Sequence, residues 1–163
     1  MKQNLLEEKA QAVGQIPSGL FVVCSQVKER PQINAFLASW VQQVSFDPLL
    51  ISLAIKPGRP CYEDIVTGNI FSLNIVGEKN NGFLKHFWNG YDPEKNLFST
   101  IPHEIGVHGG VLIKEAQSSM ECKFLEFSRP GDHQIIFAEV LSGRFSQNSL
   151  RPMVHIRKTG LEY

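Results

Sequence analysis

The segment NAFLASWVQQVSFDPLLISLAIKPGRP, residues 34–60, decides the fold of this chain. It runs to a turn at Ser45–Pro48 and continues through an almost unbroken apolar stretch, Leu49–Ile55. Side chains alternate between two faces along a strand, so one face of this stretch is purely apolar and belongs in a core, whereas the other is mixed. The segment therefore predicts two strands joined by a tight turn.

Polar groups gather at one end of this pair of strands. Ser39 precedes an aromatic residue, Trp40, and two cations, Lys56 and Arg59, follow the second strand around a Pro-Gly break. Hydroxyls, backbone amides and cations at one place suit a planar, hydrogen-bonding ligand that carries a phosphate, because Arg offers a fork of donors and Lys a point charge.

Length and charge limit the classes of protein to consider. The 163 residues predict one domain, 1–163, with a substantial core. The 16 basic and 16 acidic residues cancel, which argues against nucleic acid or an anionic membrane as partner. The longest apolar run is too short to span a bilayer and the N-terminus lacks an apolar signal core, so we expect a cytoplasmic protein.

The three cysteines predict neither a disulfide framework nor a zinc site, because they are odd in number, widely spaced and form no CxxC pair. Cys24 and Cys122 are expected to be small buried hydrophobes. Cys61 follows Arg59-Pro60 at an expected helix start, where a thiolate would be favoured, so a redox role stays open for it. The histidines have no metal-ligand spacing, and no metal site is predicted.

Strand-like runs dominate the rest of the chain. Strands are expected at residues 19–27, 33–41, 49–55, 70–76, 111–127, 133–145 and 153–160, and short helices at 2–13, 60–68 and 82–88. The irregular section 89–110 is either a flap over a ligand or a plain connection. The sequence thus predicts a mainly β (α+β) protein, an antiparallel barrel of six to seven strands with two or three short helices.

Three motifs in this order resemble the flavin reductase-like, FMN-binding split-barrel family. They are NAFLASWVQQVSFDP (34–48), FSLNIV (71–76) and GDHQIIFAEVL (131–141), and the resemblance covers roughly residues 16–156. The Ala-Ser-Trp-Val sequence is also similar to the flavin reductase module of flavodiiron proteins. The chain departs from the family pattern at Trp40, where a second hydroxyl is common, and at Leu49, where a second proline is common.

The resemblance implies a split β-barrel and a set of ligand contacts. The implied FMN-binding residues are Ala38, Ser39, Trp40, Val41, Gln42, Ser45, Phe46, Asp47, Lys56 and Arg59. It also places His133 near the flavin, where this residue would meet the incoming nicotinamide. The alternatives are local turn hydroxyls for Ser39 and Ser45, a solvated loop for the two cations, core or interface packing for Trp40, and a turn residue satisfied by Asp132 for His133.

The function implied by the resemblance is reduction of flavin or another acceptor by NADH or NADPH, through hydride transfer to FMN, with FAD as a possible cofactor. A homodimer is implied as well, with a free flavin or a redox protein as acceptor. Two alternatives stay open: an FMN electron-transfer protein without turnover, resembling flavoredoxin, and a flavin-free split barrel that binds another ligand.

Overall fold

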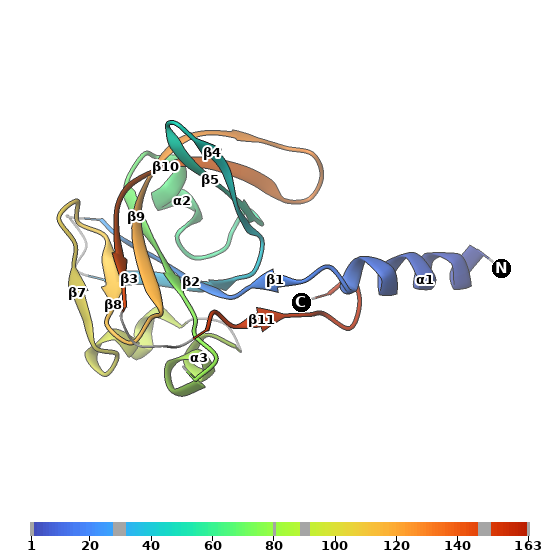
Figure 1. Ribbon diagram of the computed structural model, residues 1–163, viewed down its shortest axis with the longest axis horizontal. Helices are drawn as coiled ribbons and strands as arrows, with labels where there is room; N and C mark the ends of the chain where they lie inside the picture. The colour runs from blue at the N-terminus through green and yellow to red at the C-terminus, as the bar shows by residue number, and fades with distance from the viewer. Residues whose placement is uncertain (1, 28–31, 80, 89–91, 147–150, 163) are drawn as a thin grey trace.

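A computed structural model describes residues 2–27, 32–79, 81–88, 92–146 and 151–162 (Figure 1). The helices are α1 (Lys2–Gly14), α2 (Tyr62–Val66) and α3 (Asn81–Trp88), with 3-10 turns η1 (Pro93–Lys95) and η2 (Leu97–Ser99). The strands are β1 (Ser18–Gly19), β2 (Phe21–Gln26), β3 (Ile33–Ala38), β4 (Val41–Phe46), β5 (Leu49–Ile55), β6 (Ile70–Ile75), β7 (His103–Ile105), β8 (Val111–Ile113), β9 (Ser118–Ser128), β10 (Gln134–Phe145) and β11 (Val154–His155).

The main sheet has seven antiparallel strands in the order β3-β2-β6-β9-β10-β5-β4. Its two edge strands, β3 and β4, follow one another in sequence and are joined only by Ser39 and Trp40. Three Cα steps of 3.80 Å separate Ala38 from Val41 and span at most about 11 Å. The sheet must therefore curl until its two edges meet at this corner, which makes it the predicted split barrel (Figure 1).

The central strands β2 and β6 are buried on both faces, so the core forms two clusters. Along β2, Val22 and Cys24 pack into one cluster with β8 and α3, while Val23 packs into the other with β5 and α2. This explains why residues 19–27 read as apolar on both faces. On β5 the predicted core face holds Ile51, Leu53 and Ile55 buried, but Leu49 at the hairpin end is half exposed.

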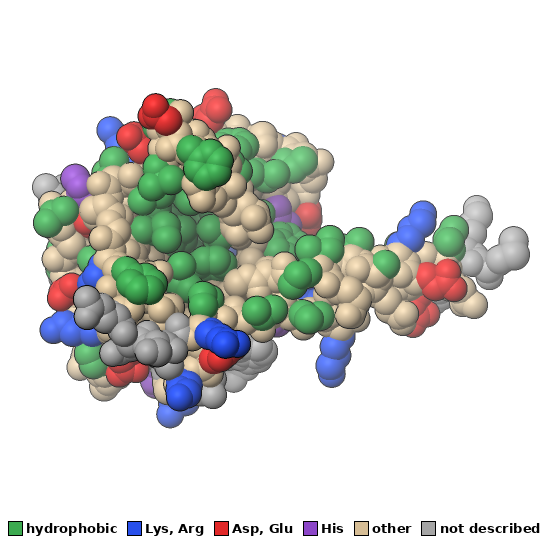
Figure 2. Space-filling model, viewed as in Figure 1, with side chains coloured by type: hydrophobic (Ala, Val, Ile, Leu, Met, Phe, Trp, Pro, Cys, Tyr) green, Lys and Arg blue, Asp and Glu red, His purple; other side chains and the backbone are tan. Residues whose placement is uncertain are grey.

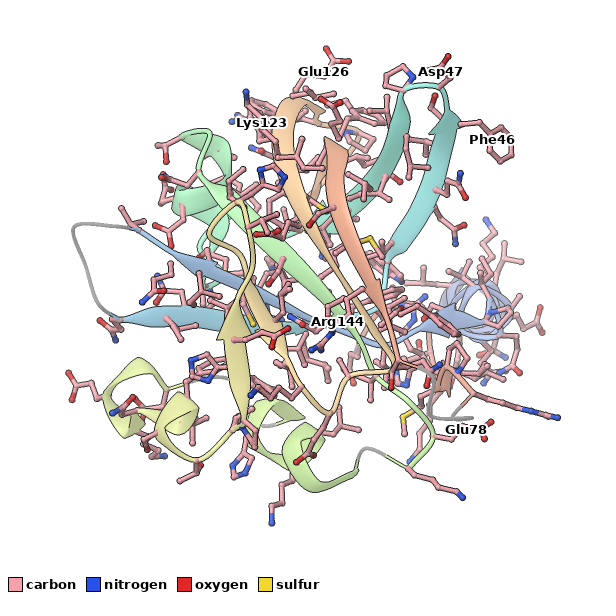
Figure 3. The ribbon with its side chains drawn as sticks, turned by 60° about the vertical axis from the view of Figure 1, so that its left-hand side comes forward. Phe46, Asp47, Glu78, Lys123, Glu126 and Arg144 are labelled. Carbon is pink, nitrogen blue, oxygen red and sulfur yellow. The ribbon has the colours of Figure 1, made fainter. Side chains whose placement is uncertain are left out.

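Buried polar groups attach the β7–β8 hairpin to the barrel. Glu121 on β9 is fully buried, and its carboxylate accepts hydrogen bonds from the amide of Gly110 at 2.7 Å and the hydroxyl of Ser142 at 2.6 Å. A Cβ on Gly106 would lie 2.5 Å from the same carboxylate, so the turn approaches it as only glycine can. Arg144 on β10 donates a hydrogen bond to the carbonyl oxygen of Ile113, the last residue of β8, at 2.6 Å (Figure 3).

The N-terminal helix projects from the barrel as an arm (Figure 1). It is tied down by the C-terminal segment, because β1 pairs with β11 and the amide of Gly160 donates to the carbonyl oxygen of Ala10 at 2.6 Å. Figure 2 shows apolar side chains along the arm, and four large ones are about half exposed or more: Leu5, Leu6, Val13 and Ile16. None of the helices in the described part of the chain has the length and apolar character needed to cross a bilayer.

Most predicted elements are present, with five corrections. The predicted strand at 33–41 is interrupted at Ser39 and Trp40 and the chain continues as β4, and the predicted strand at 153–160 is reduced to β11. The helix after Arg59 begins at Tyr62 and not at Pro60, because Cys61 adopts a left-handed conformation with φ 70°. The predicted strand at residues 111–127 is two strands, β8 and β9, separated by a turn. The section from 92 to 110 contains β7 and two 3-10 turns; the first three residues of the predicted irregular section, 89–91, lie outside the described residues.

Candidate functional site

A cleft opens where the split barrel closes, between the β3–β4 corner and the end of β5. Its volume is about 270 Å³ with its open mouth included. The lining residues come from these two places in the sheet and the turn after β5: Phe36, Leu37, Ala38, Ser39, Trp40, Ala54, Ile55, Lys56 and Arg59. Five of them, Ala38, Ser39, Trp40, Lys56 and Arg59, are predicted site residues. The cleft is shallow, so a ligand larger than a few atoms would lie at its mouth and extend over exposed β4.

Ser39 is the polar group at the base of this cleft. Its side chain is 5% exposed, and its Oγ has no hydrogen-bond partner in the described part of the chain. A buried hydroxyl without a partner costs about 1–3 kcal/mol, so such groups are rare unless a ligand or water satisfies them. The alternative that Ser39 hydrogen-bonds locally as a turn hydroxyl is therefore wrong. Its hydroxyl is available to a bound molecule.

The corner itself is fixed by the backbone. The amide of Ala54 on β5 donates to the carbonyl oxygen of Trp40 at 3.0 Å, which holds the corner against the strand that supplies Lys56. Because β3 and β4 are edge strands, each carries backbone groups on its outer side that no neighbouring strand in the sheet pairs. Near the corner, where the two edges meet, such backbone groups are candidates to bind the hydrogen-bonding edge of a planar ligand.

Two exposed cations stand at the mouth of the cleft. Lys56 follows the last residue of β5, and a turn with a hydrogen bond from Arg59 N to Lys56 O (3.2 Å) brings Arg59 back beside it. Gly58 occupies this turn with φ 85°, a conformation that favours glycine. Since α2 begins only at Tyr62 and is a single short turn, the cations and not a helix end supply the positive charge here.

His133 lies against Trp40 across the mouth. The two ring centroids are 5.0 Å apart, and His133 Nδ1 is 2.8 Å from the carboxylate of Asp132. The hydrogen bond from His133, followed by smaller effects that include the charge of Lys56, lowers the pKa of the exposed Asp132 carboxyl. The structure thus places His133 in contact with Trp40, a predicted site residue. It also shows the contact with Asp132 that is expected if His133 is only a turn residue.

The other predicted residues lie along β4, outside the lining of the cleft. Val41 packs partly against the core, Gln42 is exposed, and Ser45 is partly exposed. Figure 3 shows Phe46 and Asp47 at the far end of the β4–β5 hairpin, with Phe46 pointing away from the barrel at 91% exposure. A ligand in the cleft would contact these residues only by extending along this strand.

Sequence reasoning missed two residues next to the site. Arg157 is buried, and its guanidinium lies over the Trp40 ring at 4.8 Å from the centroid. Gln134 is buried beside His133. With the side-chain amide turned so that its oxygen faces Arg129, this oxygen accepts a hydrogen bond from the guanidinium at 2.8 Å. The contact anchors the turn before β10. A lone arginine in an irregular C-terminal segment carries no periodicity or motif, so no local signal could have identified Arg157.

Among the residues that the structure describes, the buried thiols and the remaining acidic and histidine side chains form no metal-binding group. Burial raises the pKa of Cys61 to about 12, which overturns the expectation of a favoured thiolate at this position. Cys24, Cys61 and Cys122 are all buried and free. Within the described ranges, no group of three His, Cys, Asp or Glu side chains is placed to hold a metal ion.

A curled antiparallel sheet whose split carries a hydroxyl and two cations defines a split barrel with a candidate site for an anionic ligand as the class of protein. Residues 13–160 match the family model described as flavin reductase like domain. The chain belongs to this family. Membership supports a flavin reductase-type oxidoreductase.

Relatives and solved structures agree with the family. The chain is 33% identical over 154 residues to a putative diflavin flavoprotein of Nostoc sp., covering 94% of this chain and 27% of that protein. It is 30% identical to a diflavin flavoprotein of Synechocystis sp., covering 99% of this chain and 28% of the relative. The chain therefore spans just over a quarter of the length of these relatives.

Two solved structures share the fold. An NADH:FAD oxidoreductase of Streptomyces globisporus superposes with a TM-score of 0.79 at 20% identity, covering 91% of this chain and 86% of that one. The styrene monooxygenase flavin reductase of Pseudomonas putida superposes with a TM-score of 0.78 at 20% identity, covering 90% of both chains.

Proposed function

We propose that this protein is an FMN-binding oxidoreductase that uses NADH or NADPH to reduce flavin or another acceptor. The observation that carries the proposal is the unpartnered hydroxyl of Ser39 in a cleft flanked by Lys56, Arg59 and His133. Family membership supports the same chemistry. FMN is favoured over FAD because the cleft presents one compact pair of cations and the sequence has no Gly-rich dinucleotide motif.

The residues present fit this cofactor. Ser39 and the backbone of the β3–β4 corner would hold the polar edge of the ring, Lys56 and Arg59 the phosphate, and β4 the remainder. Bound flavin supplies a group that accepts two electrons as a hydride and releases them singly or in pairs. Trp40 and His133 would shield one side of the site from water and orient the nicotinamide, which is the contribution that hydride transfer requires of a protein.

The experiment that tests this function has two steps. Incubation with FMN and gel filtration should give a yellow protein, and heat-released cofactor should match an FMN standard. Anaerobic mixing with NADH or NADPH should then bleach the flavin, since the nucleotide gives up two electrons and a proton as hydride and solvent supplies a second proton. Bound flavin that neither nucleotide bleaches would establish the electron-transfer alternative, and a colourless protein would establish the flavin-free one.

We also propose that two copies associate through the arm. The supporting observation is the set of half-exposed apolar side chains on α1, continued by Ile156 and Leu161 of the C-terminal segment that is tied to it. A protruding apolar helix is a typical association surface. A redox protein is a candidate acceptor, because the longer relatives are named as diflavin proteins, of which this chain matches one part. A cytoplasmic location stays a prediction.

A further inference from the structure

Three side chains from distant parts of the sequence are in contact beside the cleft. The Trp40 ring lies 5.0 Å from the His133 ring, centroid to centroid, at an interplanar angle of 57°. The guanidinium carbon of Arg157 lies 4.8 Å from the centroid of the same Trp40 ring. One indole thus contacts both the imidazole at the mouth of the cleft and a cation from the C-terminal segment.

The cation holds the ring because it is itself buried. Arg157 is 7% exposed, and a buried charge needs compensating contacts, which the electron-rich face of an indole supplies. A guanidinium is planar and stacks on an aromatic face, whereas an ammonium does not match that face in the same way. Rotation of Trp40 would deprive Arg157 of this contact, so the two side chains restrain each other.

The backbone of Arg157 is restrained as well, by the end of the arm. Its amide donates to the carbonyl oxygen of Gly14 at 3.1 Å, and the neighbouring His155 pairs with Ser18 between β11 and β1. A Cβ on Gly14 would lie 2.9 Å from the backbone carbon of Thr159 and 3.0 Å from the carbonyl oxygen of Arg157. The close packing of α1 on the C-terminal segment therefore sets the position from which the guanidinium reaches Trp40.

We propose that Arg157 is a positioning residue of the site, which fixes the Trp40 ring against His133 and so sets the face that receives the nicotinamide. Arg157 acts through Trp40 and does not contact the reacting atoms. The kinetic consequence rests on the proposed function. The restraint on Trp40 does not, and it can be measured without cofactor or nucleotide.

The first test uses tryptophan fluorescence in a Trp88→Phe background, where Trp40 is the remaining tryptophan. Protonated imidazole quenches an indole in contact with it, so Trp40 emission should fall when the protein is transferred from pH 8 to pH 5. His133→Gln should abolish this fall. Arg157→Met should reduce this fall in emission by about half or more. Arg157→Lys should reduce it less, because an ammonium still attracts the indole face although it lacks the planar guanidinium group.

Gly14→Ala provides a matched variant that leaves all three side chains in place. Its methyl group displaces the C-terminal segment, so it should weaken the pH-dependent quenching in the same direction as Arg157→Met. Gly82→Ala is the control, because a Cβ there meets nothing within 4 Å. Unchanged quenching in both Arg157 variants and in Gly14→Ala would overturn the proposal.

The second test separates positioning from binding. With FMN and nucleotide saturating, Arg157→Met should lower kcat about tenfold, while the Kd for FMN and the KM for the nucleotide change less than about twofold. An equal loss of FMN affinity would assign Arg157 to the binding site and overturn the positioning role. If the wild-type protein oxidises neither nucleotide, the proposed function fails, whereas the quenching experiment still decides for or against the restraint on Trp40.

Discussion

The hydroxyl of Ser72 donates a buried hydrogen bond to the carbonyl oxygen of Val111 across 2.5 Å, whereas the buried hydroxyl of Ser39 has no partner in the described ranges. Ser39→Ala should therefore leave the free energy of unfolding of the ligand-free protein unchanged or raise it. FMN binding should weaken by about 0.5–1.5 kcal/mol, the usual net value of one hydrogen bond. Urea unfolding and a fluorescence titration measure the two quantities.

Ser72→Ala is the matched control for this substitution. It removes this hydrogen bond, although Asn74 still donates to the same carbonyl oxygen at 3.1 Å, and should lower the free energy of unfolding by about 0.5–1.5 kcal/mol. A comparable destabilisation by Ser39→Ala would show that its hydroxyl is satisfied within the protein.

Arg59→Ala should weaken FMN binding by about 1.5–3 kcal/mol, the range for a hydrogen bond to a charged group, because the guanidinium stands at the mouth of the cleft beside Lys56. Riboflavin, which lacks the phosphate, should bind almost as before. Lys123→Ala, which removes an exposed cation on β9 outside the lining of the cleft (Figure 3), should affect neither ligand. Equal losses for FMN and riboflavin would place Arg59 outside the phosphate site.

His133→Ala should keep FMN bound with a nearly unchanged visible spectrum and slow flavin reduction by about tenfold, which corresponds to about 1.4 kcal/mol of transition-state stabilisation. The reason is the lost contact with Trp40. Anaerobic stopped-flow absorbance isolates this step. Asp132→Asn, which removes the carboxylate partner of His133, should produce a smaller decrease. Identical rates for wild type and His133→Ala would return His133 to the role of a turn residue.

The buried thiols should resist alkylation in the folded protein. Burial raises the pKa of Cys61 to about 12 and, together with the charge of Glu121, that of Cys122 to about 12, so iodoacetamide at pH 8 should label neither until the protein is unfolded. The pKa of a thiol in the unfolded chain is about 8.5. Above that pH the unfolded state releases protons that the folded state retains, so the free energy of unfolding should decrease as pH rises. Labelling of Cys61 under native conditions would contradict its burial.

Leu6→Glu should convert the proposed dimer into a monomer, because it places a charge among the exposed apolar side chains of the arm. Light scattering after gel filtration measures the mass. Val107→Glu is the control, since Val107 is 87% exposed in the turn between β7 and β8, away from the arm. A dimer that survives Leu6→Glu would place the interface elsewhere.

Local patterns predicted most of the fold. Alternation of side chains identified β5 with its actual bounds, Leu49–Ile55, and apolar residues on both faces identified β2 as a strand. The split at residues 113–118 was missed because apolar and β-forming residues continue on both sides of a short turn. The start of α2 was misplaced because Cys61 adopts a left-handed conformation, which a cysteine in the sequence gives no reason to expect.

The candidate site was predictable where one segment carries it and unpredictable where distant segments meet. Residues 38–59 include the five predicted lining residues of the cleft, both cations among them, which flank one hairpin, although the break at Ser39 and Trp40 itself was not predicted. Arg157 and Gln134 reach the site only through tertiary packing. The β-sheet order that brings these segments together cannot be read from the separate strands.

The corner at Ser39 and Trp40 implies an order in which the strands of the sheet must pair. The hairpins β2–β3 and β4–β5 are neighbours in sequence, yet within the sheet they are connected only through β6, β9 and β10. Pairings over long sequence separations form slowly, because the intervening chain must first be ordered. Once synthesis has passed Arg59, the growing chain contains every residue that lines the cleft. The cleft itself forms only after β10, which ends at Phe145, has been made and has paired with β5. Capture of a ligand by the cleft would thereby wait until β10 has been made and paired, and a chain that stops before β10 would lack this cleft.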